Sequence, residues 1–548
     1  MIRPSRPAAR AGGDPKRVWW RDGVIYQVYP RSFADSNGDG VGDLEGIRSR
    51  LDHLAWLGVD GIWISPFFSS PMKDFGYDVA DYCDVDPLFG SLADFDRLLD
   101  DAHARGIRVI LDFVPNHSSD QHPWFLDSRS SRTSSRRDWY VWRDPAPQGG
   151  PPNNWVAIFG GSAWEWDAAT GQYYLHSFLM QQPDLNWRNP ELERAMHDVL
   201  RFWLDRGVDG FRIDVAHRIA KDPELRSNPL VDGNSDPGYG GQHHLYDEDH
   251  PDLHALYRRM RRLVDAYDER VLIGEVFLMD PARVARYYGD GDELHQGFNF
   301  SLLSGAWSGE RFKHEALRFQ AAVPPLGWPN QVLSNHDVHR HATRYEHPEL
   351  GEARARLAAL LLLLLRGTPF LYYGEEIGMR CVWIPENRLR DPIAFTLHPS
   401  LTRDPERTPM QWDGTPFAGF SSTEPWLPIH YDSTHRNVEK QRDDASSLLQ
   451  LYRALIALRA AHPALSRGEQ RALPAPHDVF AFERTHGGER FVVALNFGDA
   501  PTVVSLGQGP PLSGLHSRSA SELPGDLGQV ALGAAEGVVL RVASSAPQ

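Results

Sequence analysis

GFRIDV, at residues 210–215, sets the pattern on which the fold prediction rests. The run is almost continuously apolar instead of alternating, which is typical of a parallel strand buried on both faces. A helical pattern at residues 190–206 precedes it, and Gly207 stands between the two as the usual residue at the end of a helix. The stretch therefore predicts one helix–strand unit of a parallel α/β protein.

The same kind of run recurs along the chain. Further candidate strands are VIYQVY (24–29), GIWIS (61–65), RVILDFV (108–114), VLIGEV (271–276), GFNF (297–300), QVLS (331–334) and PFLYY (369–373). Helical patterns at residues 44–57, 92–105 and 352–366 lie before three of them. Eight strands in repeating units predict an α/β protein built on a (β/α)8 TIM barrel. A doubly wound open sheet is the alternative, but it lacks the support of a Gly-rich dinucleotide loop.

Two segments depart from this regularity. Residues 117–185 are rich in Trp, Pro, Gly and Asn and show no clear helix, so we expect an inserted subdomain on the loop after the third strand. From about residue 475 the pattern alternates, with Gly487 and Gly488 at a hairpin turn, which predicts an antiparallel β-sandwich. The predicted domains are a flexible arm (1–18), the barrel (19–116 and 186–474), the insertion (117–185) and the sandwich (475–548).

Composition narrows the class of protein. The 548 residues include 73 acidic and 57 basic side chains, and the net charge of −16 disfavours nucleic acid and anionic membranes as partners. Two cysteines, Cys83 and Cys381, are expected to be free thiols in a reducing cytosol. The basic N-terminus lacks the apolar segment of a secretory signal, and the apolar run at residues 357–365 is much shorter than the ~20 residues of a membrane span. We therefore expect a cytoplasmic protein.

Carboxylates stand at the carboxyl ends of the candidate strands, the end of a barrel that carries the active site. They are Asp112, Asp214, Glu275 and Asp337. Each alone would more often be a helix cap or an ion-pair partner. Together with Arg212, and with His117 and His336 each following an asparagine, the set indicates a catalytic site.

The chemistry of two carboxylates suggests the reaction. Asp214 lies two residues after Arg212, on the same side of the strand, and a neighbouring arginine keeps a carboxylate ionised, as a nucleophile requires. Glu275 ends an apolar strand, where a raised pKa would make it a proton donor. One ionised carboxylate and one carboxylic acid are what retaining glycoside hydrolysis needs.

The motifs DFVPNH, GFRIDVAH, GEVF and SNHD, in this order, resemble those of the α-amylase superfamily, glycoside hydrolase family 13. The resemblance covers about residues 19–497. It implies that Asp214 is the nucleophile, Glu275 the general acid/base and Asp337 the third carboxylate, which holds ring hydroxyls. It further implies that Arg212, His117 and His336 line the subsite of the attacked sugar.

Within the superfamily, QPDLNW (182–187) resembles the oligo-1,6-glucosidase and α-glucosidase branch. DFGYDVADY supplies Asp74 and Tyr77, and ERTPMQW supplies Arg407, whose equivalents close the site around one terminal glucose. The resemblance thus implies exo action on short α-glucosides such as maltose, with a plain surface ion pair as the alternative for Asp74 and Arg407.

Linkage preference is less sharply defined. Val215, after the predicted nucleophile, is associated in the resembled enzymes with α-1,6 cleavage, but the following Ala216 and His217 depart from the usual pair. We predict a broad exo-α-glucosidase for maltose-type α-1,4 substrates, with α-1,6 linkages, sucrose and transglucosylation left open. The rivals are a transglucosidase of the trehalose synthase or sucrose isomerase type and a non-catalytic superfamily member.

DSNGDGVGD (35–43) places oxygen ligands at alternating positions, with Gly40 at a sharp turn, as in a calcium loop. The predicted ligands are Asp35, Asn37, Asp39, the Val41 carbonyl and Asp43. Position 12 is Gly46 instead of the Glu of the helix–loop–helix motif. The resembled branch has a similar loop that binds Ca²⁺ or Mg²⁺, so we expect a structural cation, with a metal-free Asx turn as the alternative.

Overall fold

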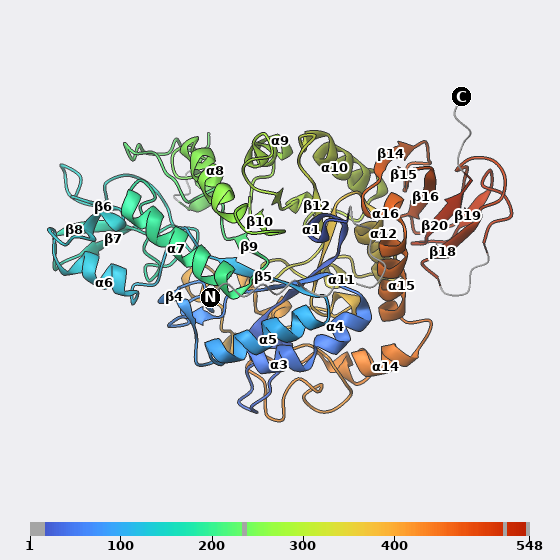
Figure 1. The fold of residues 1–548 in the computed structure, drawn as a ribbon, viewed down its shortest axis with the longest axis horizontal. Coiled ribbons are helices and arrows are strands. Elements are labelled where there is room, and N and C mark those ends of the chain that lie inside the picture. Colours follow the sequence, from blue (N-terminus) through green and yellow to red (C-terminus); the bar gives the residue numbers. More distant parts are fainter. Residues whose placement is uncertain (1–16, 233–237, 519–522, 544–548) are drawn as a thin grey trace.

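A parallel eight-stranded sheet forms the centre of the computed structural model, which describes residues 17–232, 238–518 and 523–543. Its order is β11-β10-β9-β5-β2-β1-β13-β12, and every neighbouring pair is parallel. The strands are β1 (Ile25–Val28), β2 (Gly61–Ile64), β5 (Arg108–Phe113), β9 (Gly210–Ile213), β10 (Val271–Gly274), β11 (Gln296–Gly297), β12 (Asn330–Val332) and β13 (Thr368–Tyr372). The predicted TIM barrel is confirmed (Figure 1).

Side-chain amides join the two end strands of this order. The backbone N–H of Asn299, just after β11, donates to Asn330 Oδ1 in β12 at 3.0 Å, and Asn330 Nδ2 donates to Gln296 Oε1 at 3.3 Å. Amide side chains offer both donors and acceptors, so they can link strands whose backbones do not pair. These bonds bring the ends of β11 and β12 together and close the barrel.

The predicted helices are present with one change. They are α5 (Leu92–Ala104), α7 (Pro190–Arg206) and α12 (Gly351–Leu364), while the pattern at residues 44–57 forms two helices, α3 (Leu44–Ser49) and α4 (Leu51–Leu57). Arg50 separates the two, and its guanidinium is held over the Trp412 ring at 4.4 Å and donates to the Gly419 carbonyl. This anchor explains the break. Further long helices are α8 (Asp252–Val264), α10 (Gly309–Ala322) and α15 (Leu448–Ala461).

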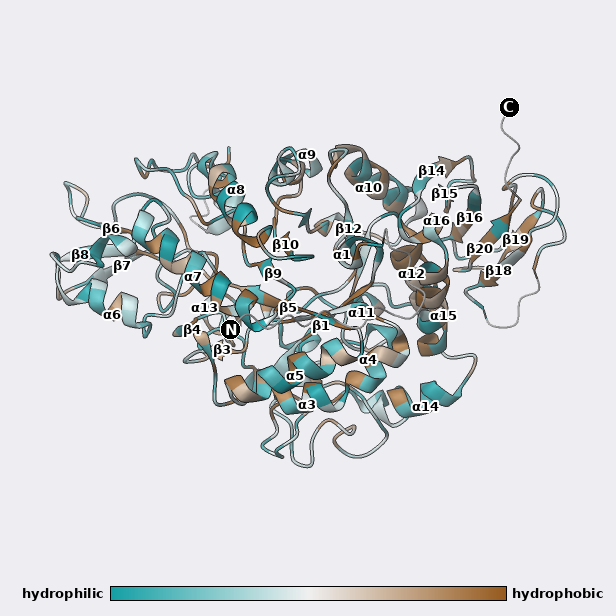
Figure 2. Cartoon of the chain, viewed as in Figure 1, coloured by the Kyte–Doolittle hydropathy of each residue, from teal (hydrophilic) through white to brown (hydrophobic). Residues whose placement is uncertain are grey.

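Helix α12 carries the apolar run of the sequence and is buried on nearly every side. It packs against α15 and against the C-terminal strands β16 (Glu489–Asn496) and β20 (Gly537–Val542), and it is coloured brown almost throughout in Figure 2. A helix that is apolar all round belongs inside a protein. In the part of the chain that the structure describes, no helix is long and apolar enough to cross a membrane.

The segment between β5 and α7 lies at one end of the molecule (Figure 1). It contains the three-stranded sheet β6-β8-β7, built from β6 (Trp142–Arg143), β7 (Trp164–Asp167) and β8 (Gln172–Leu175). It also contains α6 (Pro123–Ser130), so the expectation of no helix here was wrong. His122 caps this helix, Pro123 occupies its first position, and Phe125 packs on Tyr140 and Trp142. Aromatic packing stabilises a helix whose weak periodicity hid it in the sequence.

The C-terminal strands form an antiparallel sheet at the opposite end, in the order β14-β15-β16-β20-β18 (Figure 1). The hairpin of β15 (Val479–His486) and β16 turns at Gly487 and Gly488, as predicted. A second sheet joins β17 (Thr502–Val504) and β19 (Val530–Leu532), and β18 is Ser513–His516. Strand β14 (Glu469–Leu473) also belongs to the large sheet, although it precedes the predicted boundary at residue 475.

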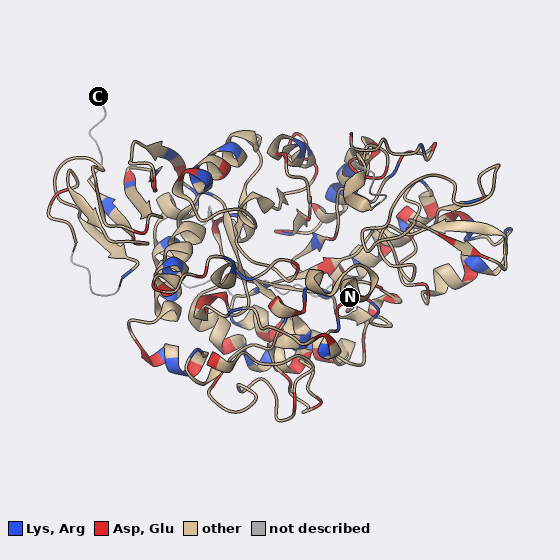
Figure 3. Ribbon diagram, turned by 180° about the vertical axis from the view of Figure 1, so that it is seen from behind, with Lys and Arg blue, Asp and Glu red and all other residues tan. Residues whose placement is uncertain are grey.

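Charged residues of both signs lie side by side over the helices (Figure 3). Cys83 and Cys381 are both free, as predicted. Most of the predicted N-terminal arm, residues 1–16, lies outside the described residues.

Candidate active site

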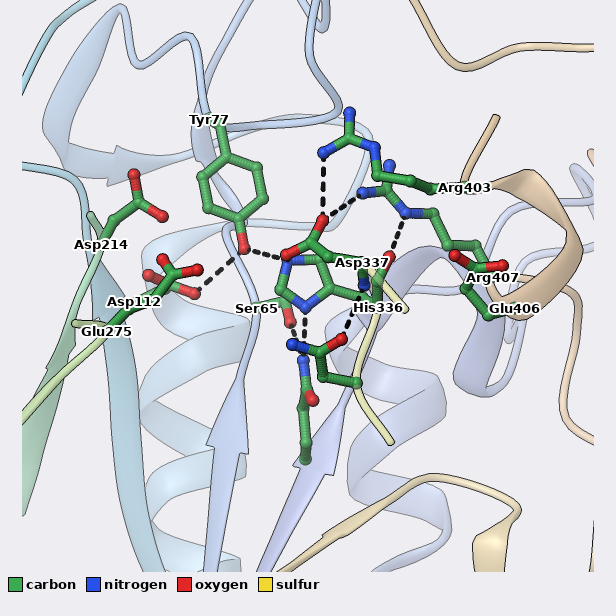
Figure 4. Close-up of polar contacts among 12 residues, drawn as sticks. Ser65, Tyr77, Asp112, Asp214, Glu275, His336, Asp337, Arg403, Glu406 and Arg407 are labelled. Atoms are coloured by element: carbon green, nitrogen blue, oxygen red, sulfur yellow. Dashed lines mark hydrogen bonds and ion pairs between the residues drawn. The ribbon is translucent and has the colours of Figure 1, made fainter. Parts of the chain in front are cut away.

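The predicted catalytic carboxylates meet at the carboxyl end of the barrel (Figure 4). Asp112 lies near the end of β5, Asp214 directly follows β9, and Glu275 directly follows β10. Asp337 lies in the loop after β12. Asp112 lies within the ladder, opposite Arg212 of β9. The backbone N–H groups of Asp214 and Glu275 extend the ladder by donating to the Phe113 and Ile213 carbonyls, both at 2.9 Å. The barrel therefore brings together four acids that are far apart in the sequence.

Arg212, in β9, connects three of these acids. Its Nη1 donates to Asp112 Oδ1 and to Asp214 Oδ1, both at 2.7 Å, and its Nη2 donates to Glu275 Oε2. The guanidinium also lies 5.1 Å from the centre of the Trp63 ring. One planar cation thus fixes the orientation of the predicted nucleophile and of the predicted acid/base.

Val215 supplies a second contact to Glu275. Its backbone φ is +36°, a conformation that a β-branched residue rarely adopts. In this conformation the Val215 N–H donates to Glu275 Oε2 at 3.1 Å. Backbone strain of this kind persists where the surrounding structure enforces it, and it is common at active sites. Here the strain aims an N–H at the acid/base candidate.

The protonation of this cluster differs from the sequence-based expectation that Arg212 keeps Asp214 ionised. Burial raises the pKa of Asp214 well above its usual range, the charges of Glu275 and Asp112 add to the rise, and Arg212 opposes it. Burial likewise raises the pKa of Asp112 to about 6. One guanidinium cannot balance the charge of three buried carboxylates. The cluster therefore retains a proton that each carboxyl group would lose if it stood alone in water. The cluster thus holds a proton of the kind that acid catalysis requires.

Asp337 occupies a different electrostatic environment on the other side of Tyr77 (Figure 4). Its Oδ1 accepts from Arg403 Nη1 at 3.0 Å and from Arg407 Nη2 at 2.9 Å. Burial alone would raise the pKa of Asp337, but His336, Arg403 and Arg407 outweigh burial and hold the pKa well below its usual range. This carboxylate is therefore ionised, as a group that holds sugar hydroxyls should be.

Asp74 is buried, and its arginine partner is Arg403. Arg403 Nη2 donates to Asp74 Oδ1 at 3.2 Å, whereas Arg407 donates to Asp337 and, through Nε, to the His336 carbonyl at 2.7 Å. Asp74 is 4% exposed and Arg407 is 1% exposed, so a surface ion pair is ruled out. Sequence reasoning missed Arg403, which stands four residues before Arg407 in RDPERTPMQW.

Tyr77 and His336 link the two halves of the site. Their rings stack with centroids 5.6 Å apart, and Tyr77 OH lies 2.6 Å from His336 Nε2 and donates to Asp112 Oδ2 at 3.3 Å. Gln27 Nε2 donates to His336 Nδ1 at 2.8 Å, which leaves the proton of the neutral ring on Nε2. Burial lowers the pKa of His336 to about 3, so the ring is neutral.

His117 lies beside the same group through Gln182, a residue of QPDLNW. Gln182 Nε2 lies 3.1 Å from His117 Nε2 and donates to Asp74 Oδ2 at 3.2 Å. Burial lowers the pKa of His117 to about 4, so this ring is also neutral. The motif was read from the sequence as a mark of substrate preference, and the structure shows that its glutamine contacts two predicted site residues.

The predicted cation loop folds tightly at residues 35–43. Asp35 accepts from the backbone N–H groups of Asn37, Gly38 and Gly40, and Asp43 caps α3 through the Gly46 N–H at 2.6 Å. Oxygen donors suit Ca²⁺ or Mg²⁺ and carry further lone pairs, while the same bonds form Asx turns. Over residues 17–232, 238–518 and 523–543 no three His, Cys, Asp or Glu side chains gather as a metal-binding group. The cation stays a prediction.

Comparison with known proteins tests whether the chain belongs to the family that its motifs resemble. The family model described as the alpha amylase catalytic domain matches residues 27–468, most of the chain. The chain belongs to the α-amylase family. The resemblance to glycoside hydrolase family 13 is thereby confirmed, and the protein is a glycoside hydrolase of this family that acts on α-glucosides.

Relatives of this α-amylase-family chain share its length. A probable alpha-glucosidase of Rhizobium meliloti is 45% identical, over 90% of this chain and 92% of the relative. An oligo-1,6-glucosidase of Heyndrickxia coagulans is 40% identical, over 88% of this chain and 92% of the relative. The crystal structure of an alpha-glucosyl transfer enzyme, XgtA, has a TM-score of 0.90 at 43% identity, covering 96% of this chain and all of that one. The trehalulose synthase MutB reaches 0.88 at 35% identity, with the same coverage.

Proposed function

We propose that the protein is a retaining exo-α-glucosidase that releases α-glucose from the non-reducing end of maltose-type and related short α-glucosides. The observation that carries the proposal is the single guanidinium of Arg212, which holds Asp214 and Glu275 together at the ends of adjacent strands. A nucleophile and a proton donor beside one another are the two parts of a double displacement.

The proposed reaction has two steps. In the first, the proton that the cluster retains is on Glu275 and Asp214 is ionised. Glu275 gives this proton to the glycosidic oxygen while an Asp214 oxygen bonds to the anomeric carbon from the opposite face, which breaks the glycosidic bond and forms a β-linked glucosyl-enzyme. In the second, Glu275 takes a proton from water, whose oxygen displaces Asp214. The α configuration is restored because the carbon has been inverted twice. A sugar hydroxyl in place of water gives transglucosylation.

The exo-acting part of the proposal rests on the residues that lie on the other side of Tyr77 from Asp214 and Glu275. Asp74, Arg403 and Asp337 form one ion-paired group in which Asp74 is buried and the other two are partly exposed, and Gln182 joins Asp74 to His117. Such a group offers charged acceptors and donors for the distal hydroxyls of one terminal glucose. When these side chains bind the distal hydroxyls, a longer chain has no room to continue there, which supports action on chain ends over internal linkages.

Transfer to a sugar acceptor is the second candidate function. Its support is the similarity to XgtA, described as an alpha-glucosyl transfer enzyme, and to a trehalulose synthase. Both readings share Asp214, Glu275 and the glucosyl-enzyme, and they differ only in the acceptor of the second step. Val215 lies next to the proposed nucleophile, and the resemblance to oligo-1,6-glucosidases associates valine at this position with α-1,6 linkages.

Proton NMR of digests of maltose, isomaltose and sucrose separates these functions. We expect α-glucose as the first-formed anomer from maltose, with mutarotation to β following later. Trehalose from maltose, or an isomer of sucrose without free glucose, would support transfer instead. First-formed β-glucose would contradict the retaining mechanism, and inertness toward all three sugars would contradict the function.

We also propose that residues 35–43 bind a structural Ca²⁺ or Mg²⁺ away from the reacting groups. Chelation with EDTA should lower the melting temperature by about 2–4 °C, because a ligand that binds only the folded state adds to stability. Readdition of Ca²⁺ or Mg²⁺ should restore it, and Asp35→Asn should melt the same with and without EDTA. Cation-independent melting of the wild type, with no bound metal by elemental analysis, would overturn the proposal.

A further inference from the structure

Asp391 is a completely buried carboxylate in the loop after β13, and none of the site motifs contains it. It binds one edge of the Arg403 guanidinium. Arg403 Nε donates to Asp391 Oδ2 at 2.9 Å, Nη2 donates to Oδ1 at 2.8 Å, and the Arg403 backbone N–H donates to Oδ2 at 2.7 Å. A bidentate pair of this kind fixes the plane of the guanidinium as well as its position.

The other edge of the same guanidinium faces the proposed sugar-binding carboxylates. Nη1 donates to Asp337 at 3.0 Å, and Nη2 also reaches Asp74 at 3.2 Å, longer than either side-chain bond to Asp391. The Phe159 ring, from the inserted segment, lies 5.3 Å from the Arg403 guanidinium carbon. Arg403 is thus shared among three carboxylates, and Asp391 holds it most closely.

Asp391 is itself held in place. Asp404 Oδ2 accepts from the backbone N–H groups of Arg390 and Asp391, at 2.6 and 3.1 Å. Burial alone would raise the pKa of Asp391, but the charge and hydrogen bonds of Arg403 lower it below its usual range. The carboxylate therefore carries a full charge inside the protein, and Arg403 is its compensating partner.

We propose that Asp391 is a positioning residue for recognition of the terminal glucose, acting through Arg403. This inference rests on the proposed function. The Asp391 charge neutralises Arg403 and holds one edge of its guanidinium away from the sugar-binding carboxylates. Asp74 and Asp337 can therefore exchange their longer contacts with Arg403 for contacts with sugar hydroxyls. Without that charge, Arg403 binds Asp337 and Asp74 more tightly, and substrate must displace it. Asp391 contacts no reacting atom, so its removal should weaken substrate binding and raise KM more than it lowers kcat.

Steady-state kinetics of Asp391→Asn on 4-nitrophenyl α-glucoside test this. We expect KM to rise about tenfold and kcat to change by less than about threefold. The wild type should prefer this substrate strongly over its 4-deoxy analogue, and the variant should show a smaller preference because its grip on the distal hydroxyl is weakened. An unchanged KM, or an undiminished preference, would overturn the proposal.

A double-mutant cycle shows whether Asp391 acts through Arg403. In the Arg403→Gln background, Asp391→Asn should add little, whereas additive effects would contradict the proposal. Arg403→Lys keeps the positive charge but loses the planar guanidinium, so it should raise KM similarly. This variant tests the proposal if Asp391→Asn does not fold.

Asp167→Asn, which removes a fully buried carboxylate paired with Arg129 in the inserted segment, is the matched control and should leave KM unchanged. A wild type that hydrolyses neither glucoside would overturn the proposed function itself.

Discussion

Asp214→Asn should lose at least about 10⁴-fold in kcat while the fold becomes no less stable. Activity is lost because the amide cannot form the glucosyl-enzyme. Stability is kept because burial and the carboxylates of Glu275 and Asp112 make the Asp214 charge unfavourable in the folded state. The pKa of Asp214 is higher folded than unfolded, so its contribution to stability falls as pH rises above about 4. The melting temperature of the variant relative to wild type should therefore increase with pH.

Asp209→Asn is the matched control, because Asp209 is a fully buried carboxylate that stands just before the same strand, at its opposite end. Burial alone would raise the pKa of Asp209, but His103, Arg108 and Arg270 outweigh it and lower the pKa. Its charge is thus favourable in the folded state, and we expect a lower melting temperature with kcat nearly unchanged. Wild-type kcat in Asp214→Asn would show that another group is the nucleophile.

Glu275→Gln should show a substrate-dependent loss. Maltose needs a proton on its departing sugar, so its hydrolysis should fall about 10³-fold. A 4-nitrophenyl group leaves without that proton, so the first step should survive and the second, which needs a base, should become rate-limiting. Burst kinetics with 4-nitrophenyl α-glucoside would detect this change.

Azide distinguishes the two carboxylates, because it is a nucleophile that needs no base. With Glu275→Gln it should restore turnover and give α-glucosyl azide by displacing Asp214. With Asp214→Asn, any azide product should be the β anomer, from a single displacement. Equal losses on both substrates with no response to azide would contradict the role of Glu275.

Sequence patterns located the barrel well because its strands are buried on both faces and therefore form apolar runs that a single sequence reveals. They located Asp214, Glu275 and Asp337 because a carboxylate at the end of such a run stands out. Helix α6 was missed because aromatic contacts within the inserted segment, not periodicity, stabilise it. The break at Arg50 was missed because its anchors, Trp412 and Gly419, are hundreds of residues away.

The finer organisation of the site depended on three-dimensional neighbours. Arg403, which the sequence analysis did not single out, binds Asp74, whereas Arg407 binds Asp337, and only the fold shows which arginine of one short motif faces which acid. The protonation of Asp214 was misjudged because sequence shows the adjacent Arg212 but not the two further carboxylates that share it. The left-handed backbone of Val215 likewise follows from the turn that begins at Asp214 and from the bond of the Val215 N–H to Glu275, not from any preference of valine.

The central claim is that Asp214 bonds covalently to glucose. Incubation with 5-fluoro-α-glucosyl fluoride, whose second fluorine slows the breakdown of the glucosyl-enzyme, should trap that species, and mass spectrometry of the digested protein should locate it. The account predicts one fluoroglucosyl group, carried by the peptide that contains Asp214 and fragmenting to that residue. A label on Asp112 or Asp337, or turnover that yields β-glucose with no adduct, would contradict it.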